Sequence, residues 1–170
     1  MHIDVYDNFF PTEVQKDIWY LLQRPRWSPH GGEMAHNPDS KKTKFWHMDN
    51  LEKEDFFNTF LYDLICKNLN INYKIARIYA NGQNGGQSGN YHIDDGDITF
   101  LYYPNPEWKV EWGGHLVFLN KEETETNKIV SYKPNRAVIF PSEIPHAVDG
   151  ISRFYPLVRM SLAYKFLIPE

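Results

Sequence analysis

The sequence has little cysteine and no long apolar run. Cys66 is the only cysteine in 170 residues, so a disulfide within the chain is excluded and a reducing compartment is expected. No stretch of 18 apolar residues is present, and the N-terminus lacks the charged and then apolar segments of a signal peptide. We therefore expect a soluble cytoplasmic protein that has no membrane partner.

Clustered positive charge is also absent. The chain has 18 Lys and Arg residues against 22 Asp and Glu residues, which gives a formal net charge of −4. No block rich in Lys or Arg supplies the electrostatic footprint of a nucleic-acid-binding protein, so we expect no nucleic-acid partner. No repeat or low-complexity tract indicates a second domain, and residues 1–170 are expected to form a single domain.

Short alternating segments dominate the second half of the chain. Strands are predicted over residues 75–79, 91–94, 98–103, 116–119, 129–132, 137–140 and 157–167. Many short strands separated by turn residues indicate a sandwich or a barrel. We predict a mainly β fold, a double-stranded β-helix or jelly roll, over roughly residues 72–168.

Two apolar stripes with helical spacing precede the strands. The first helix opens at Pro11 and should end near Gln23, and the second covers residues 51–68. Both helices, within a support region of roughly residues 8–70, are expected to pack outside one sheet.

Two other segments show no regular pattern. Residues 25–50 contain several prolines and glycines and are predicted to be a surface loop, and residues 81–90 are too Gly-rich and polar for regular structure. Whether either segment forms a lid over a site stays open.

The segment around His92 and Asp94 contains two candidate metal ligands. Residues i and i+2 of a strand point to the same face, so this imidazole and this carboxylate would lie side by side. His146, far along the chain, is the candidate for a third ligand once a barrel closes. Two histidines and one carboxylate on one face of a metal leave positions open, which is typical of non-haem Fe(II) oxygenases.

The last predicted strand has one face suited to a carboxylate ligand. Arg159, Ser161 and Ala163 share that face, opposite an apolar face. Arg159 could bind a carboxylate through two parallel hydrogen bonds, and Ser161 could donate another. Arg153 is the competing arginine for this role.

His92-x-Asp94, the distal His146 and Arg159-x-Ser161, in this order, resemble the Fe(II)/2-oxoglutarate-dependent dioxygenases, most closely the prolyl 4-hydroxylase-like branch. Three further matches are Tyr79-Ala80-Asn81-Gly82, Leu101-Tyr102-Tyr103-Pro104-Asn105 and Trp112-Gly113-Gly114. The resemblance covers roughly residues 73–166. In this family the basic residue usually follows the distal histidine by about ten positions; here the spacing is longer, so residues 152–157 must loop out.

The resemblance implies a set of site residues and a reaction. His92, Asp94 and His146 would bind Fe(II), and the cosubstrate 2-oxoglutarate would be bound by Arg159, Tyr103, Tyr79 and Ser161. The enzyme would use O2 to hydroxylate a C–H bond, most simply in a prolyl or other side chain of a peptide or protein, with succinate and CO2 as co-products. Ascorbate is a further candidate cofactor. A small-molecule substrate and the oligomeric state stay open.

Two other functions are compatible with parts of this pattern. Oxidative dealkylation of nucleic acid would use Arg153 and Arg159, which have the Arg-x5-Arg spacing of that branch, but Tyr155 and Leu157 replace its Asn and Thr. A metal-binding jelly roll without catalytic activity is the other alternative. His115, which follows the Gly-Gly turn, is a rival histidine whose role stays open.

Overall fold

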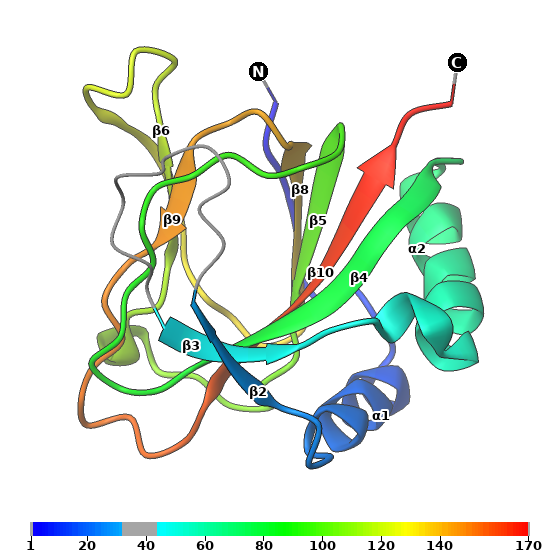
Figure 1. The fold of residues 1–170 in the computed structure, drawn as a ribbon, viewed down its shortest axis with the longest axis horizontal. Coiled ribbons are helices and arrows are strands. Elements are labelled where there is room, and N and C mark those ends of the chain that lie inside the picture. The colour runs from blue at the N-terminus through cyan, green and yellow to red at the C-terminus, as the bar shows by residue number, and fades with distance from the viewer. Residues whose placement is uncertain (1, 32–43, 170) are drawn as a thin grey trace.

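Two antiparallel sheets face each other, and helices cover the outer side of the larger sheet (Figure 1). The computed structural model describes residues 2–31 and 44–169. The helical elements are α1 (Thr12–Leu22), a 3-10 turn (Leu51–Lys53), a π-helical segment (Phe56–Leu61), α2 (Tyr62–Leu69) and a second 3-10 turn (Val110–Trp112). Within these described residues, no helix is long and apolar enough to cross a membrane.

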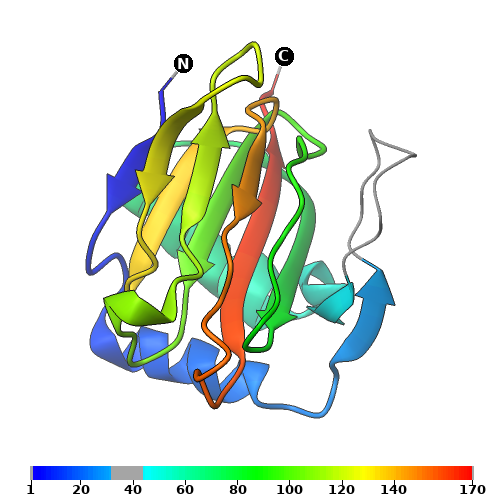
Figure 2. The same ribbon diagram turned by 90° about the vertical axis from the view of Figure 1, so that its left-hand side faces the viewer.

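The larger sheet has the strand order β1-β8-β5-β10-β4-β3-β2, and the smaller sheet has the order β7-β6-β9. The strands are β1 (Asp4–Tyr6), β2 (Ser28–Gly31), β3 (Lys44–Met48), β4 (Lys74–Gln83), β5 (Ile98–Tyr103), β6 (Leu116–Leu119), β7 (Thr126–Val130), β8 (Arg136–Pro141), β9 (His146–Val148) and β10 (Arg159–Leu167). Figure 2 shows the smaller sheet in front of the larger one, with the helices behind. The predicted double-stranded β-helix with N-terminal helices is confirmed.

The central strand β10 separates two environments, because successive side chains of a strand point to opposite faces. One face packs into the core formed with α1 and α2, through Met160, Leu162, Tyr164 and Phe166. Burial of each such large apolar side chain stabilises the fold by roughly 1.5–3 kcal/mol. The other face points between the two sheets and carries Arg159, Ser161, Ala163 and Lys165, all of them buried.

The prediction of a loop over residues 25–50 is wrong in part. β2 and β3 lie in this segment and extend the edge of the larger sheet, with Trp46 paired to Gly82 and His47 paired to Asn81 on β4. Long-range pairing, which leaves no periodic signal in a segment rich in Pro and Gly, determines these strands. A lid role for residues 32–43 lies outside the described residues.

The strand before the Gly-rich segment is longer than predicted. β4 continues through Asn81 and Gly82 to Gln83, where it pairs with Arg159 of β10. A Cβ on Gly82 would lie 3.0 Å from the Val158 side chain, so glycine permits this close packing. Only the remainder of the segment, from residue 84 onward, lacks strand structure.

The predicted strand over residues 91–94 is not a regular strand. His92 forms an isolated bridge to His146, and the rest of the segment has no strand assignment. The same bridge adjoins β9, a three-residue strand that the sequence pattern did not indicate. His92 and Asp94 nevertheless point to the same side, because local backbone pairing holds each of them.

Candidate active site

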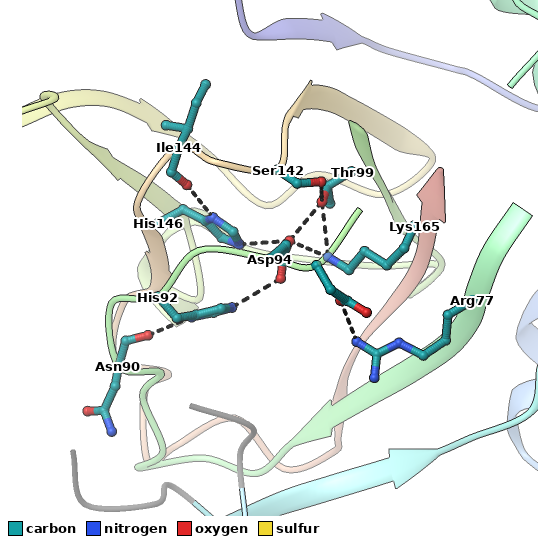
Figure 3. Close-up of polar contacts among 10 residues, drawn as sticks. Arg77, Asn90, His92, Asp94, Thr99, Ser142, Ile144, His146 and Lys165 are labelled. Atoms are coloured by element: carbon teal, nitrogen blue, oxygen red, sulfur yellow. Dashed lines mark hydrogen bonds and ion pairs between the residues drawn. The ribbon is translucent and has the colours of Figure 1, made fainter. Parts of the chain in front are cut away.

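Three side chains from distant parts of the chain meet between the sheets. His92, Asp94 and His146 each offer one ligand atom, and these atoms lie within 4.8 Å of one another. Asp94 is central: its Oδ1 is 3.5 Å from His92 Nε2, and its Oδ2 is 3.3 Å from His146 Nε2. Figure 3 shows both imidazoles on one side of the Asp94 carboxylate. The structure thus brings together all three predicted ligands.

Backbone hydrogen bonds determine this meeting point. The amide of His92 donates to the carbonyl of His146 at 3.0 Å, and the amide of His146 donates back at 2.9 Å. The amide of Asp94 donates to the carbonyl of Ser142 at 2.9 Å, at the end of β8. The two histidine rings therefore lie 4.5 Å apart, centroid to centroid, without requiring a regular strand at residue 92.

Each imidazole has one nitrogen occupied and the other directed at Asp94. His92 Nδ1 lies 2.8 Å from the carbonyl of Asn90, and His146 Nδ1 lies 2.8 Å from the carbonyl of Ile144. A carbonyl only accepts, so Nδ1 of each ring carries the proton of this hydrogen bond, and Nε2 is the nitrogen that can bind a metal. Metal-binding histidines commonly donate the N–H of the non-ligating nitrogen to such a carbonyl.

Asp94 has polar partners on the side away from the histidines (Figure 3). Thr99 Oγ1 donates to Asp94 Oδ2 at 2.8 Å, and the ammonium of Lys165 contacts the same oxygen. Lys165 also donates to Thr99 Oγ1 at 3.0 Å, and Ser142 Oγ lies 3.0 Å from that hydroxyl. The Thr99 hydroxyl can therefore accept from Lys165 and Ser142 while it donates to Asp94.

These contacts determine the charge states. Burial works to raise the pKa of the Asp94 carboxyl, but Lys165 and His146 outweigh it and hold that pKa well below its usual range. Burial lowers the pKa of His146, although Asp94 opposes the shift. Asp94 is therefore ionised and His146 neutral near pH 7, which are the states that bind a metal.

The three side chains fit a divalent metal ion. Two imidazoles with free Nε2 atoms and one ionised carboxylate form the donor set of non-haem Fe(II) sites. The Asp94 and His146 side chains are 7% and 5% exposed, whereas His92 is 30% exposed. Of the three candidate ligands, His92 is therefore the one most accessible to solvent.

Arg159 forms a second polar centre on the same inner face of β10. It is 1% exposed, its Nε donates to the Gly114 carbonyl at 2.8 Å, and its Nη1 donates to Gln83 Oε1 at 3.0 Å. A Cβ on Gly114 would lie 2.8 Å from Arg159 Nε, so the Gly-Gly turn permits this contact. Within the described residues, no carboxylate forms an ion pair with Arg159.

The other predicted cosubstrate contacts lie near Arg159 or the histidines. The Arg159 guanidinium carbon is 5.4 Å from the centroid of Tyr103, whose buried hydroxyl has no hydrogen-bond partner in the described chain. Burial raises the pKa of Tyr103 to about 12, so the phenol keeps its proton. Ser161 is the next inward residue after Arg159, and Tyr79 lies under Lys165, 5.7 Å from its ammonium.

The rival residues have other partners. His115 Nδ1 accepts from the Tyr132 amide at 3.2 Å, and the His115 amide donates to Asp149 Oδ1 at 2.6 Å. His115 is therefore hydrogen-bonded to the residues that flank the smaller sheet. Arg153 is exposed and lies 5.1 Å above the ring of Phe154. Arg153 therefore does not share the buried environment of Arg159.

The sequence analysis missed Lys165 and Thr99 as site residues. Alternation along β10 places Lys165 on the same face as Arg159, two residues beyond Ala163, and this was the available signal. Lys165 pairs with Thr99 of β5, which shares its face with Tyr103. A lysine at an inward strand position requires a buried anion, and here that anion is Asp94.

Comparison with protein families agrees with this geometry. Residues 74–166, more than half of the chain, match the model of the 2OG-Fe(II) oxygenase superfamily. The chain belongs to this superfamily. Fe(II) and 2-oxoglutarate are accordingly its cofactor and cosubstrate, in agreement with the set of His92, Asp94 and His146.

Solved structures show the same fold at low sequence identity. A Trichoplax adhaerens prolyl hydroxylase in complex with a hypoxia inducible factor peptide fragment has a TM-score of 0.71 and 20% identity, over 97% of this chain and 83% of that one. A Pseudomonas putida prolyl-4-hydroxylase has 0.69 and 19%, over 99% and 93%. A Burkholderia pseudomallei oxidoreductase of the 2OG-Fe(II) oxygenase family has 0.71 and 13%, over 96% and 84%. No curated protein matches the chain.

Proposed function

We propose that this chain hydroxylates a C–H bond in a side chain of a peptide or protein, with a prolyl side chain as the first candidate. In this proposal His92, Asp94 and His146 hold Fe(II). Arg159 anchors the distal carboxylate of 2-oxoglutarate, with contacts from Tyr103, Ser161 and Tyr79.

The burial of Arg159, which has no ion pair with a carboxylate among residues 2–31 and 44–169, is the observation that carries the proposal. A buried charge is costly unless it is paired, and within this part of the chain the guanidinium hydrogen-bonds only to a carbonyl and an amide, both uncharged. The buried hydroxyl of Tyr103, which has no hydrogen-bond partner within the same part of the chain, adds a donor beside it. A dicarboxylate that reached from the metal to Arg159 would satisfy both groups.

The inner face of β10 connects the two centres with small side chains. Ala163 and Ser161 lie between Lys165 at the metal ligands and Arg159, and both are buried. A bulky residue at either position would occupy the path that a bound dicarboxylate has to take. The sequence of charged, small, small and charged residues on one strand face therefore suits a ligand that is anionic at both ends.

Bound iron would supply the activation of O2 that couples decarboxylation of 2-oxoglutarate, to succinate and CO2, with hydroxylation of the substrate. The chain's own residues bind and orient. The carbonyls of Asn90 and Ile144 hold the rings so that both Nε2 atoms face the metal position. Phe118 and Phe140 pack against the His146 ring, at 5.9 Å and 4.8 Å between centroids, and exclude water there.

Two observations support a peptide substrate. The folds of two prolyl hydroxylases match this one over nearly its whole length, and one of them is in complex with a peptide. In this chain the exposed edge of the site is at His92, next to Tyr91, which is 43% exposed. A side chain that projects from an extended peptide could reach the metal from this edge.

The class of reaction is tested under anaerobic conditions. Fe(II) and then 2-oxoglutarate are added to the metal-free protein, and the visible charge-transfer band of the chelated keto acid is recorded. We expect a band in the wild type and in Arg153→Ala, whose arginine is exposed, and no band in Arg159→Ala. Iron binding without a band in the wild type would contradict the proposal.

The substrate class is tested separately in air. With Fe(II), ascorbate and 2-oxoglutarate, we expect proline-containing peptides to increase succinate formation and to gain the mass of one oxygen atom. If the band forms but no such peptide increases succinate, the peptide assignment is wrong while the cosubstrate assignment stands.

A further inference from the structure

The two oxygens of Asp94 have unequal surroundings. Oδ2 accepts a hydrogen bond from Thr99 Oγ1 at 2.8 Å and also contacts the ammonium of Lys165. Oδ1 lies 3.5 Å from His92 Nε2, and Oδ2 also lies 3.3 Å from His146 Nε2, so each oxygen faces one imidazole. The two oxygens differ in their other contacts: Thr99 and Lys165 both hold Oδ2.

The position of Lys165 is determined by the fold. The residue is 1% exposed, lies on the inner face of β10, and pairs across the sheet with Arg77 on one side and Thr99 on the other. The pairing between β10 and β4 shifts register immediately after Lys165. Its ammonium also donates to Thr99 Oγ1 at 3.0 Å, so the two donors to Oδ2 support each other.

A purely stabilising role explains this lysine poorly. Burying an ammonium costs free energy that its ion pair with a carboxylate seldom exceeds, and apolar replacements of buried ion pairs are often neutral or stabilising. Arg77, the cross-strand neighbour, keeps its partner Asp95 at the surface, where solvation is retained. Lys165 instead lies in the interior, against a metal ligand.

We propose that Lys165 is a positioning residue that makes Asp94 a ligand through one oxygen only, by holding Oδ2 away from the metal. This inference rests on the proposed function, since it assumes that Asp94 binds the metal ion. Partners of a metal ligand commonly fix its orientation in this manner. Here the partner also carries a positive charge, and a charge-assisted hydrogen bond is stronger than a neutral one.

The consequence concerns the number of open positions on the metal. In an octahedral ion, three protein ligand atoms leave about three positions: two for the keto acid and one for O2. If both oxygens of Asp94 bound, about two positions would remain, and the keto acid would fill them. Without Lys165 the protein would therefore bind 2-oxoglutarate but lack a position for O2.

The test counts water molecules on Mn(II), an octahedral stand-in for Fe(II), by water-proton relaxation. In the wild type we expect about three coordinated waters, falling to about one when 2-oxoglutarate is added. In Lys165→Met we expect about two, falling to none. Lys165→Arg keeps a charged donor and should restore the wild-type values. Lys16→Met, an exposed lysine of α1, is the matched control and should be unchanged.

A second readout separates binding from reaction. With Fe(II), Lys165→Met should give the anaerobic charge-transfer band yet form succinate at least about 10-fold more slowly than the wild type, in keeping with the loss typical for a partner of a metal ligand. A residue that merely supported the fold would lower both signals together. Equal water numbers in the wild type and Lys165→Met would overturn the inference.

The wild type alone keeps the inference falsifiable if Lys165→Met does not fold. About two waters falling to none would show Asp94 binding through both oxygens, which contradicts the role of Lys165 and leaves the proposed function intact. No change in the relaxation on addition of 2-oxoglutarate would instead contradict the proposed function itself.

Discussion

Replacing Arg159 by methionine should remove most of the stabilisation that 2-oxoglutarate gives to the folded protein. The guanidinium uses Nε for the Gly114 carbonyl and Nη1 for Gln83, so its other N–H groups remain for a carboxylate. Removing one partner of a buried, charge-assisted contact costs about 2–5 kcal/mol of binding free energy. The dissociation constant of 2-oxoglutarate should therefore rise by at least about 30-fold, and a loss of about 2.7 kcal/mol raises it about 100-fold.

The assay is thermal unfolding of the anaerobic Fe(II) protein, with 2-oxoglutarate at about 100 times the wild-type dissociation constant. Linkage then predicts about 2.7 kcal/mol of stabilisation for the wild type and about 0.4 kcal/mol for the variant. For a domain of this size each kcal/mol shifts Tm by about 2–4 °C, so the wild type should gain roughly 5–11 °C and the variant about 1–2 °C.

Two comparisons exclude trivial explanations. Arg153→Met removes an exposed arginine and should keep the full shift. In the metal-free state, Arg159→Met loses hydrogen bonds to Gly114 and Gln83 but also removes a desolvated charge, and these effects oppose each other. We therefore expect the variant to fold. If folded Arg159→Met showed the same rise in Tm with 2-oxoglutarate as the wild type, the assignment of Arg159 as the anchor would be refuted.

Three further predictions follow from other contacts. Ala163→Leu should weaken 2-oxoglutarate binding but not Mn(II) binding in calorimetry, because the side chain enters the face between the two centres; equal 2-oxoglutarate affinity would contradict this. His146→Ala should lower Mn(II) affinity by more than about 100-fold, whereas His115→Ala should keep it and lose about 1 kcal/mol of stability with its hydrogen bond. Arg136 and a neighbouring lysine lower the pKa of Asp7 to about 2. The ionised Asp7 carboxylate therefore stabilises the fold above about pH 4, and this stabilisation is lost toward pH 2. In urea titrations Asp7→Asn should be less stable than the wild type by under about 1 kcal/mol at pH 6, and this difference should shrink below pH 4.

The sequence permitted prediction of strands that are apolar on both faces and of one strand that alternates. β5 and β8 are short apolar runs because one face meets the helices and the other faces the smaller sheet, whereas β10 alternates between an apolar face and a face with Arg159 and Ser161. The candidate ligands were found by spacing and order, although the reason offered for His92 and Asp94, a shared strand face, does not describe the segment. Reciprocal amide hydrogen bonds with His146 place His92 there, and such pairing leaves no local pattern.

The residues that escaped prediction owe their positions to tertiary contacts. β3 is defined by its pairing with β4, across a segment without period. Lys165 was overlooked because a charge within an otherwise buried strand has no local explanation, and its partner Asp94 lies in a separate segment of the chain. Gln83 was assigned to a loop, yet it ends β4 opposite Arg159 and accepts its hydrogen bond.

One strand connects the candidate metal ligands with the proposed cosubstrate anchor. Lys165 contacts Asp94, Arg159 is the proposed partner of the cosubstrate carboxylate, and both lie on the inner face of β10, which is paired on both sides by β4 and β5. A shift of β10 along its neighbours would turn both residues out of the site, because a one-residue slip exchanges the two faces of a strand. The apolar outer face of β10, packed against α1 and α2, opposes this slip. The packing of α1 and α2 thus fixes the register of β10 and keeps the Arg159 and Lys165 side chains on its inner face.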